Sequence, residues 1–143
     1  MNTDDSVKIK MTFKAPVQRV WKTWTDPEQV LRWFGSDPNG MGIHAHLDVR
    51  PTGNYEITFQ DSDHTEHTCR GSYIEVREFN KLIFTWTWKS EPGVESLVTV
   101  LFIPNGAHTQ MQFEHAQVGT RSVHDYVAGW KDAFSKLDLL LRA

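Results

Sequence analysis

The sequence predicts an α+β domain in which a curved antiparallel sheet packs on one long C-terminal helix, with two short helices after the first strand. Turn signals recur at strand spacing between His44 and His115, which predicts a run of consecutive antiparallel strands. The segment that follows carries an apolar stripe at helical spacing, which predicts a long amphipathic helix. A helix and a sheet that each have one apolar face bury those faces against each other, and this pairing defines the predicted fold.

The 143 residues fit one domain spanning 1–143 with a single hydrophobic core. Apolar residues make up 39% of the chain and charged residues 23%, which is typical of a folded protein rather than a disordered one. The net charge of -3 provides no basic field for phosphates, so we expect no nucleic-acid partner. One cysteine, no signal-peptide pattern and no apolar run long enough to span a bilayer predict a cytoplasmic protein without membrane insertion.

Residues 7–13 form the first predicted strand, because apolar side chains alternate there with polar ones. The polar side chains are mostly lysines, and we interpret them as a solvated strand face rather than a basic binding patch. Pro16 is suited to the first turn of the helix that follows. The inward face of that helix is formed by Val17, Val20, Trp21 and Trp24.

A second short helix is predicted to follow directly. Asp26 is expected to cap it, Pro27 takes the first helical position, and Gly35 marks its end. Residues 36–42 are rich in Gly, Pro, Asp and Asn, so we expect a loop there.

Turn signals divide the region from His44 to His115 into six predicted strands. The signals are Pro51-Thr52-Gly53, Asp61-Ser62-Asp63, Phe79-Asn80-Lys81, Pro92-Gly93 and Asn105-Gly106. The clearest unit is the hairpin over residues 97–113, since Asn-Gly is the preferred pair for a tight turn with positive φ at both residues. Apolar and aromatic side chains alternate over residues 55–59 and 82–88, so one face of the sheet must be covered.

The cover is predicted at the end of the chain, where Ser122 is suited to cap a long helix. The apolar stripe of this helix is about five turns long. It consists of Val123, Tyr126, Val127, Trp130, Phe134, Leu137, Leu140 and Leu141.

Particular residues over nearly the whole chain add to the prediction from periodicity. They are Pro16, Val20-Trp21, Trp24, Pro27, Leu31, Trp33-Phe34, Asp48, Arg50, Gly53, Gly71, Tyr73, Leu82 to Trp86 and Gly129-Trp130. With these residues in this order, the chain resembles the Aha-type branch of the START-like (SRPBCC) superfamily, named for the C-terminal domain of the activator of the ninety-kilodalton heat-shock-protein ATPase. The resemblance implies a helix-grip fold, a cavity under the C-terminal helix, and no single reaction common to all members. At Thr52-Gly53 the family usually has two glycines, so the backbone angles of this turn are expected to differ.

An aromatic set is expected to line that cavity, because ligand pockets are mostly apolar with few polar groups. The candidate ligand-binding residues are Trp24, Trp33, Phe34, Tyr55, Phe59, Tyr73, Trp86, Phe113, His115, Tyr126, Trp130 and Phe134. The alternative is that the same rings simply fill the core, where large aromatic side chains are common. Gly129 bears on the same two alternatives. A glycine inside a helix costs about 0.5–1 kcal/mol relative to alanine, so it needs a local reason. That reason is either an open cavity or room for neighbouring side chains to pack.

The histidines are interpreted as exposed strand and loop residues rather than metal ligands. His44 with His46, and His64 with His67, have spacings that allow metal binding. Neither pair supplies the three or four convergent ligands of a closed site, so we expect no metal and no cofactor.

No known catalytic motif occurs in the sequence, so we expect no enzymatic activity. The candidate acid–base pair is His115 with Asp125, on the condition that the fold brings them together. Glu114 and Tyr73 are the other polar groups that an active site in this region would use first.

The sequence therefore predicts a module that binds a small hydrophobic molecule, such as a lipid, and acts as a carrier, sensor or sequestering protein, as a monomer or weak homodimer. One alternative is a co-chaperone-like activator of a heat-shock-protein ATPase, with a chaperone partner. Another is a small cyclase or hydrolase that uses the same cavity. A carrier needs an open apolar cavity, an enzyme needs convergent titratable groups inside it, and a chaperone activator needs a broad binding patch outside it.

Overall fold

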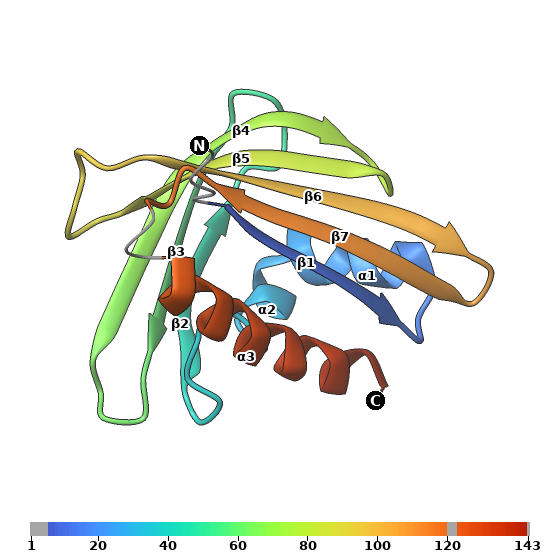
Figure 1. Ribbon diagram of the computed structural model, residues 1–143, viewed down its shortest axis with the longest axis horizontal. Helices are drawn as coiled ribbons and strands as arrows, with labels where there is room; N and C mark the ends of the chain where they lie inside the picture. The colour runs from blue at the N-terminus through green and yellow to red at the C-terminus, as the bar shows by residue number, and fades with distance from the viewer. Residues whose placement is uncertain (1–5, 120–122, 143) are drawn as a thin grey trace, which may run out of the picture.

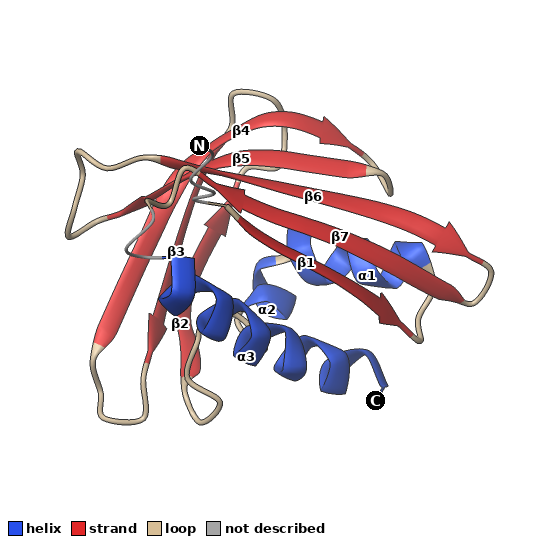
Figure 2. Cartoon of the chain, in the orientation of Figure 1, coloured by secondary structure: helices blue, strands red, loops and turns tan. Residues whose placement is uncertain are grey.

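The computed structural model describes residues 6–119 and 123–142, and Figure 1 shows one strongly curled sheet with a long helix across its open side. The elements are β1 (Val7–Phe13), α1 (Val17–Thr25), α2 (Pro27–Val30), β2 (Met41–Leu47), β3 (Asn54–Gln60), β4 (Glu66–Arg77), β5 (Lys81–Trp88), β6 (Ser96–Asn105), β7 (His108–Ala116) and α3 (Val123–Arg142). Figure 2 shows α1 and α2 within the curl of the sheet and α3 lying across it. The predicted α+β architecture is confirmed, including the six strands between His44 and His115.

The sheet has seven strands in the order β1-β7-β6-β5-β4-β3-β2, and every neighbouring pair is antiparallel. The first strand thus pairs with the last one, and β1 and β2 form the two edges. The register shifts between Gly42 and His44 in β2 and between Tyr73 and Glu75 in β4. Such bulges bend and twist a strand, so they help the sheet to curl around the helices.

The start of α1 and the cap of α2 follow local sequence rules. Pro16 is the N-cap of α1, with extended backbone angles, and so it lies just before the first turn rather than inside it. Asp26 caps α2 as predicted, because its carboxylate accepts a hydrogen bond of 3.0 Å from the backbone N–H of Glu28.

The second helix is shorter than predicted. It ends at Val30, and the chain continues in turns to Gly35, where φ is +115°. Trp33 supplies a reason for the early end: its fully buried indole donates Nε1–H to the carbonyl of Thr23 at 2.8 Å, which holds the segment against α1. This tertiary contact overrides the local preference for a longer helix.

The loop predicted over residues 36–42 is also shorter, because β2 already begins at Met41. Gly42 belongs to the strand and not to the loop. A Cβ atom at Gly42 would lie 2.6 Å from the backbone of Leu31, and the Gly42 N–H donates to the Leu31 carbonyl at 3.2 Å. The glycine therefore marks a close approach between two backbones rather than a turn.

The hairpin of β6 and β7 is confirmed, but its turn is one residue further along the chain than predicted. Asn105 still pairs with His108, so the two loop residues are Gly106 and Ala107. Only Gly106 has positive φ, at +65°, whereas positive φ was predicted at both Asn105 and Gly106. Positive φ at the first loop residue alone is typical of a type II′ turn, which leaves Asn105 free to extend the strand.

The turn between β2 and β3 places a non-glycine residue in the left-handed region. Thr52 has φ of +69°, a value that favours glycine, while Gly53 does not have positive φ. The turn is held against β4, because the Thr52 N–H donates to the Tyr73 carbonyl and the Tyr73 N–H donates to the Gly53 carbonyl, both at 2.9 Å. These hydrogen bonds offset the strain at the threonine.

The apolar stripe of α3 faces the sheet as predicted. Trp130, Phe134, Leu137 and Leu141 are buried, and Tyr126, Val127 and Leu140 are partly buried against the core. The expected cap Ser122 and the side chain of Val123 lie outside the described residues. Within the part of the chain that the structure describes, no helix is both long and apolar enough to cross a bilayer.

Candidate functional site

An open cleft lies between the N-terminal half of α3 and the concave face of the sheet, with a volume of about 340 Å³. Its walls come from β3, β5, α3 and the turns after α2 and β5. The cavity implied by the family resemblance is therefore present in the structure. The sequence-predicted binding residues that line it are Phe34, Phe59, Trp86, Tyr126 and Trp130.

The other sequence-predicted binding residues lie in the core and do not line this cleft. Phe113 and Phe134 pack edge to face with ring centroids 5.0 Å apart. An interior space of only about 20 Å³, room for about one water molecule, is surrounded by a second group. That group contains Trp24, Trp33, Tyr55 and Tyr73.

Further residues line the cleft that the sequence analysis did not name as binding residues. They are Gly35, Ser36, Trp88, Glu91, Val94, Val118, Asp125, Gly129 and Ala133. Trp88 follows Trp86 at strand spacing, so the period-two rule was sufficient to place it on the same face. Glu91, Val94 and Val118 lie in turns outside the strands, where periodicity carries no signal.

Gly129 lines the cleft and also allows a close contact. A Cβ atom at this position would lie 3.1 Å from the Cβ of Ser36, closer than most such contacts. Both local reasons considered for this helical glycine therefore apply together. The absence of a side chain lets α3 approach the turn after α2 and keeps the adjoining part of the cleft empty.

The polar part of the cleft is formed by tryptophan and tyrosine side chains. Tyr126 accepts a hydrogen bond of 2.7 Å at its hydroxyl oxygen from Nε1–H of Trp88, which links α3 to β5. Burial raises the pKa of the Tyr126 hydroxyl, so it is neutral at ordinary pH. Trp86 is buried, and its Nε1–H interacts with the Tyr126 hydroxyl without a hydrogen bond of standard geometry to any described residue.

His115 lies behind this wall and is fully buried. Its Nδ1 accepts a hydrogen bond of 3.0 Å from Nε1–H of Trp130, and its Nε2 lies 2.7 Å from Oγ of Ser96. The Ser96 hydroxyl also lies 3.3 Å from the carbonyl oxygen of Trp86, to which it donates. Burial lowers the pKa of His115 to about 3, so the ring is neutral at neutral pH.

These partners determine which tautomer of His115 is present. An indole N–H only donates, so Nδ1 is the acceptor and the proton of the neutral ring lies on Nε2. Nε2–H then donates to Ser96, and the Ser96 proton points to the Trp86 carbonyl. A general base must instead accept the proton of the serine nucleophile. The Ser96–His115 contact is therefore arranged to hold Trp130 in place and not to activate Ser96.

The polar groups considered for catalysis do not come together. Asp125 is exposed and lines the cleft, whereas His115 is buried and pairs with Ser96 and Trp130, so the proposed acid–base pair is wrong. Glu114 lies on the convex face, 3.9 Å from Nζ of Lys8. Tyr73 lies at the small interior space and has no access to the cleft.

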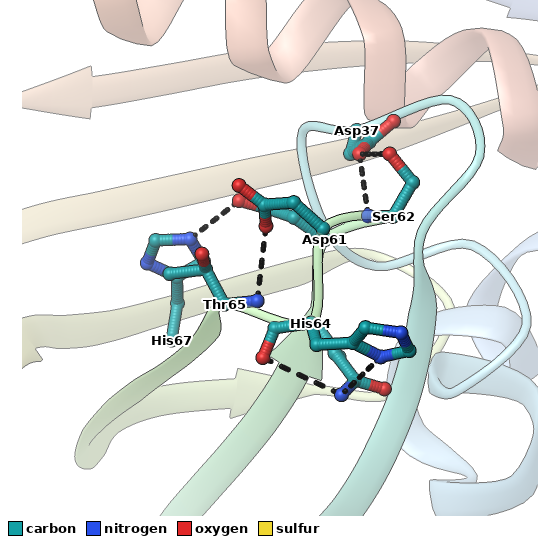
Figure 3. Close-up of polar contacts among 8 residues, drawn as sticks. Asp37, Asp61, Ser62, His64, Thr65 and His67 are labelled. Carbon is teal, nitrogen blue, oxygen red and sulfur yellow. Dashed lines mark hydrogen bonds and ion pairs between the residues drawn. The ribbon is translucent and has the colours of Figure 1, made fainter.

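The histidines near the β3–β4 turn belong to separate hydrogen-bonding groups, as Figure 3 shows. Nε2 of His67 lies 2.8 Å from Asp61, while His64 contacts Gln60 at 3.4 Å. Asp37 ties this turn to the loop before β2 by accepting from the backbone N–H and the hydroxyl of Ser62 at 2.8 and 2.9 Å.

The other histidine pair, His44 and His46, is exposed on edge strand β2. Among residues 6–119 and 123–142, no three side chains of the metal-ligating types cluster together. The expectation that the protein needs no metal stays a prediction, which chelation followed by a melting measurement tests.

Comparison with known proteins identifies the family. Residues 14–142 match the family described as activator of Hsp90 ATPase homolog 1-like protein. The chain belongs to this family. It has the helix-grip fold of the START-like superfamily, as the resemblance implied.

One relative matches most of this chain. The uncharacterized protein C1711.08 of Schizosaccharomyces pombe is 26% identical over 113 residues, which are 78% of this chain and 29% of that protein. The chain therefore spans less than a third of the length of this relative.

Two crystal structures have the same fold as this chain. Protein NE0264 of Nitrosomonas europaea is 22% identical, with a TM-score of 0.84, and the match covers 99% of this chain and 97% of that one. The AHSA1 protein of Silicibacter pomeroyi is 19% identical, with a TM-score of 0.85, and the match covers 96% and 97%.

Proposed function

We propose that the protein binds a small hydrophobic molecule in the cleft under α3 and acts as a carrier, sensor or sequestering protein. The observation that supports this most directly is the cleft itself, an open space of about 340 Å³ with aromatic walls. Small-molecule sites have volumes of about 300–1,000 Å³ and are lined mainly by apolar and aromatic side chains. The cleft meets both criteria at the small end of the range.

The walls are organised before any ligand binds. Phe34 stacks on Trp86 with ring centroids 5.9 Å apart and meets Trp130 edge to face at 5.8 Å. Trp86 and Trp130 also contact each other at 5.3 Å, and Trp130 is fixed by its hydrogen bond to His115. A ligand that enters this space immobilises few side chains, which lowers the entropic cost of binding.

Trp86 indicates one polar feature of the ligand. A buried N–H without a partner costs about 1–3 kcal/mol, and a ligand oxygen that accepts this proton recovers the loss. Because the indole of Trp86 is buried, lines the cleft and makes only a poorly aligned contact with the Tyr126 hydroxyl, we expect a mostly apolar ligand with a carbonyl, ether or hydroxyl oxygen near Nε1.

The proposal is for binding without catalysis. The tautomer of His115 is opposed to a role as a general base, and Asp125 and Glu91 are exposed. The remaining titratable group of the wall, Tyr126, is neutral and already accepts a hydrogen bond. These features favour a carrier over a cyclase or hydrolase.

The test is a titration with N-phenyl-1-naphthylamine, a neutral apolar probe whose fluorescence rises in an apolar environment. We expect saturable binding of about one probe per chain, accompanied by a change in tryptophan emission. A folded, monomeric wild type that binds no probe would contradict the proposed function.

Two variants locate the bound probe. Ser36→Phe places a ring in the cleft from an exposed loop position, so we expect weaker binding in a variant confirmed by circular dichroism to remain folded. The matched control is Ser135→Phe, on the exposed side of α3 and outside the cleft, which should bind like the wild type. Trp130→Ala should change the affinity by enlarging the space, in a variant confirmed by circular dichroism to remain folded.

A further inference from the structure

The charged side chains that line the cleft carry one sign. Glu91, in the turn after β5, and Asp125, on α3, are both acidic, and no lysine or arginine lines the cleft among the described residues. The two come from segments far apart in the sequence, and Figure 1 shows the β5–β6 turn extending past the sheet on the side where α3 begins.

Trp88 connects both carboxylates to the aromatic wall. The backbone N–H of Glu91 donates to the Trp88 carbonyl at 2.9 Å, so the turn that carries Glu91 is closed on the end of β5. Asp125 precedes Tyr126, whose hydroxyl accepts the indole N–H of Trp88 at 2.7 Å. The two acidic positions are thus anchored next to the same pair of aromatic side chains.

Neither carboxylate has an ion-pair partner within residues 6–119 and 123–142, whereas several others on the protein do. Glu75, for example, pairs with Arg77 and Lys81. The charge of Glu91 is also felt inside the cleft: besides burial, it is one of the causes that raise the pKa of the Tyr126 hydroxyl. Negative charge at the cleft is therefore not compensated by the described residues.

The aromatic rings of the cleft also favour a positively charged ligand. The negative face of an indole ring attracts a cation and not an anion, and aromatic walls combined with carboxylates are how proteins hold organic ammonium groups. Trp86 and Trp88, whose rings meet at 86° with centroids 5.2 Å apart, line the same cleft as the two carboxylates.

We propose that the ligand of this cleft is an organic cation, with an apolar body against Trp86 and Trp130 and a positively charged amine or quaternary ammonium group near Glu91 and Asp125. This inference rests on the proposed function, because it concerns the same cleft. It assigns the chemical class of the ligand, which the binding of a neutral probe does not reveal.

The test uses two competitors with the same ring system and opposite charge, N,N,N-trimethyl-2-naphthylammonium and naphthalene-2-sulfonate. Each competitor is titrated into the wild-type protein with bound N-phenyl-1-naphthylamine at low ionic strength, and displacement of the probe gives its affinity. An exposed carboxylate contributes about 0.2–1 kcal/mol to such an interaction, or about threefold in affinity. With two carboxylates that attract the cation and repel the anion, we expect the cation to bind at least about tenfold more tightly.

The variants Glu91→Gln and Asp125→Asn should each lower the cation-to-anion ratio by at least about threefold, with the affinity of the neutral probe for the same variant as the reference. The matched control is Glu95→Gln, in the same turn but outside the cleft, which should leave the ratio as in the wild type.

The cation assignment would be overturned by equal affinities for the two naphthalene ions or by tighter binding of the anion. A cation-to-anion affinity ratio that is the same in both variants as in the wild type would also overturn it. In each of these cases binding of the neutral probe still supports the proposed function. Loss of neutral-probe binding to the wild type contradicts the function itself, so the two failures are distinguishable.

Discussion

The two ends of the space between α3 and the sheet are packed differently, although the same helix and the same sheet enclose both. At the filled end, Phe134, Leu137 and Leu141 of α3 are at most 2% exposed. At the open end, the cleft of about 340 Å³ is lined on α3 by Asp125, Tyr126, Gly129, Trp130 and Ala133.

The comparison shows that aromatic content does not decide whether the space is filled. Both ends are rich in tryptophan, with Trp21, Trp24 and Trp33 at the filled end and Trp86, Trp88 and Trp130 at the open end. Figure 2 shows α1 and α2 within the curl of the sheet, and their buried side chains, Trp21 and Trp24 among them, belong to the hydrophobic core.

The largest expected effect is the loss of stability in Trp21→Ala. Trp21 packs edge to face on Phe102 at 5.3 Å and contacts Phe79 at 6.1 Å, inside the filled end. Truncating a large buried aromatic side chain commonly costs about 3–5 kcal/mol, because it removes apolar contacts and leaves a cavity. Denaturant midpoints measure the effect.

The matched change at the open end is Trp88→Ala. Trp88 is only partly buried, and its removal enlarges a space that is already open instead of creating a closed cavity, so we expect less than half the cost. Lys10→Ala, on the solvated face of β1, should have almost no effect. Equal costs for the two tryptophans would show that the open end is packed as tightly as the filled end.

The second effect concerns His115, at the boundary between the two ends. Burial lowers its pKa from an ordinary value of 6.5 to about 3, so the unfolded chain binds the proton more tightly than the folded one. The free energy of unfolding is therefore highest above pH 6.5 and falls as the pH falls towards 3. Between pH 7.5 and pH 5 the loss from this residue is about 2 kcal/mol.

His115→Gln should remove that loss, because glutamine does not titrate, although the variant is less stable at every pH. The measurement is the difference between denaturant midpoints at pH 7.5 and pH 5, compared with the wild type. His46→Gln, at an exposed position, is the control and should keep the wild-type difference. An unchanged difference in His115→Gln would show that His115 is not held neutral in the folded protein.

The smallest effect is expected at Thr52, in the turn beyond the filled end. Thr52→Gly removes a β-branched residue from φ of +69°, which relieves steric strain and adds some flexibility to the unfolded chain. The net result should be a gain of about 0.5–1 kcal/mol. Gly53→Ala is the opposite control, since a Cβ there would lie 2.0 Å from the Asp48 carbonyl oxygen, and it should destabilise the protein.

Much of the fold could be predicted because it depends on local rules. Alternation placed β1 at residues 7–13, helical spacing placed the buried stripe of α3, and Asp26 identified the start of α2. The errors arose where tertiary contacts override local preference. Trp33 ends α2 early, and Gly42 marks a backbone contact and not a loop.

The site was less predictable, because lining a cleft is a property of the whole packing. Phe34 and Trp33 are adjacent aromatic residues, yet one lines the cleft and the other donates a hydrogen bond inside the core. The tautomer of His115 depends on Trp130 and Ser96, which are distant in sequence. No pattern in a single sequence contains such pairings.

The strand order leaves two exposed sheet edges that are protected to different degrees. On β1 the outward side chains include Lys8 and Lys10, and charged lysines discourage another chain from adding a strand. On β2 the exposed side chains include Met41 and Ile43, with a bulge as the main irregularity. In a concentrated solution, self-association by strand addition is therefore expected at β2 more readily than at β1.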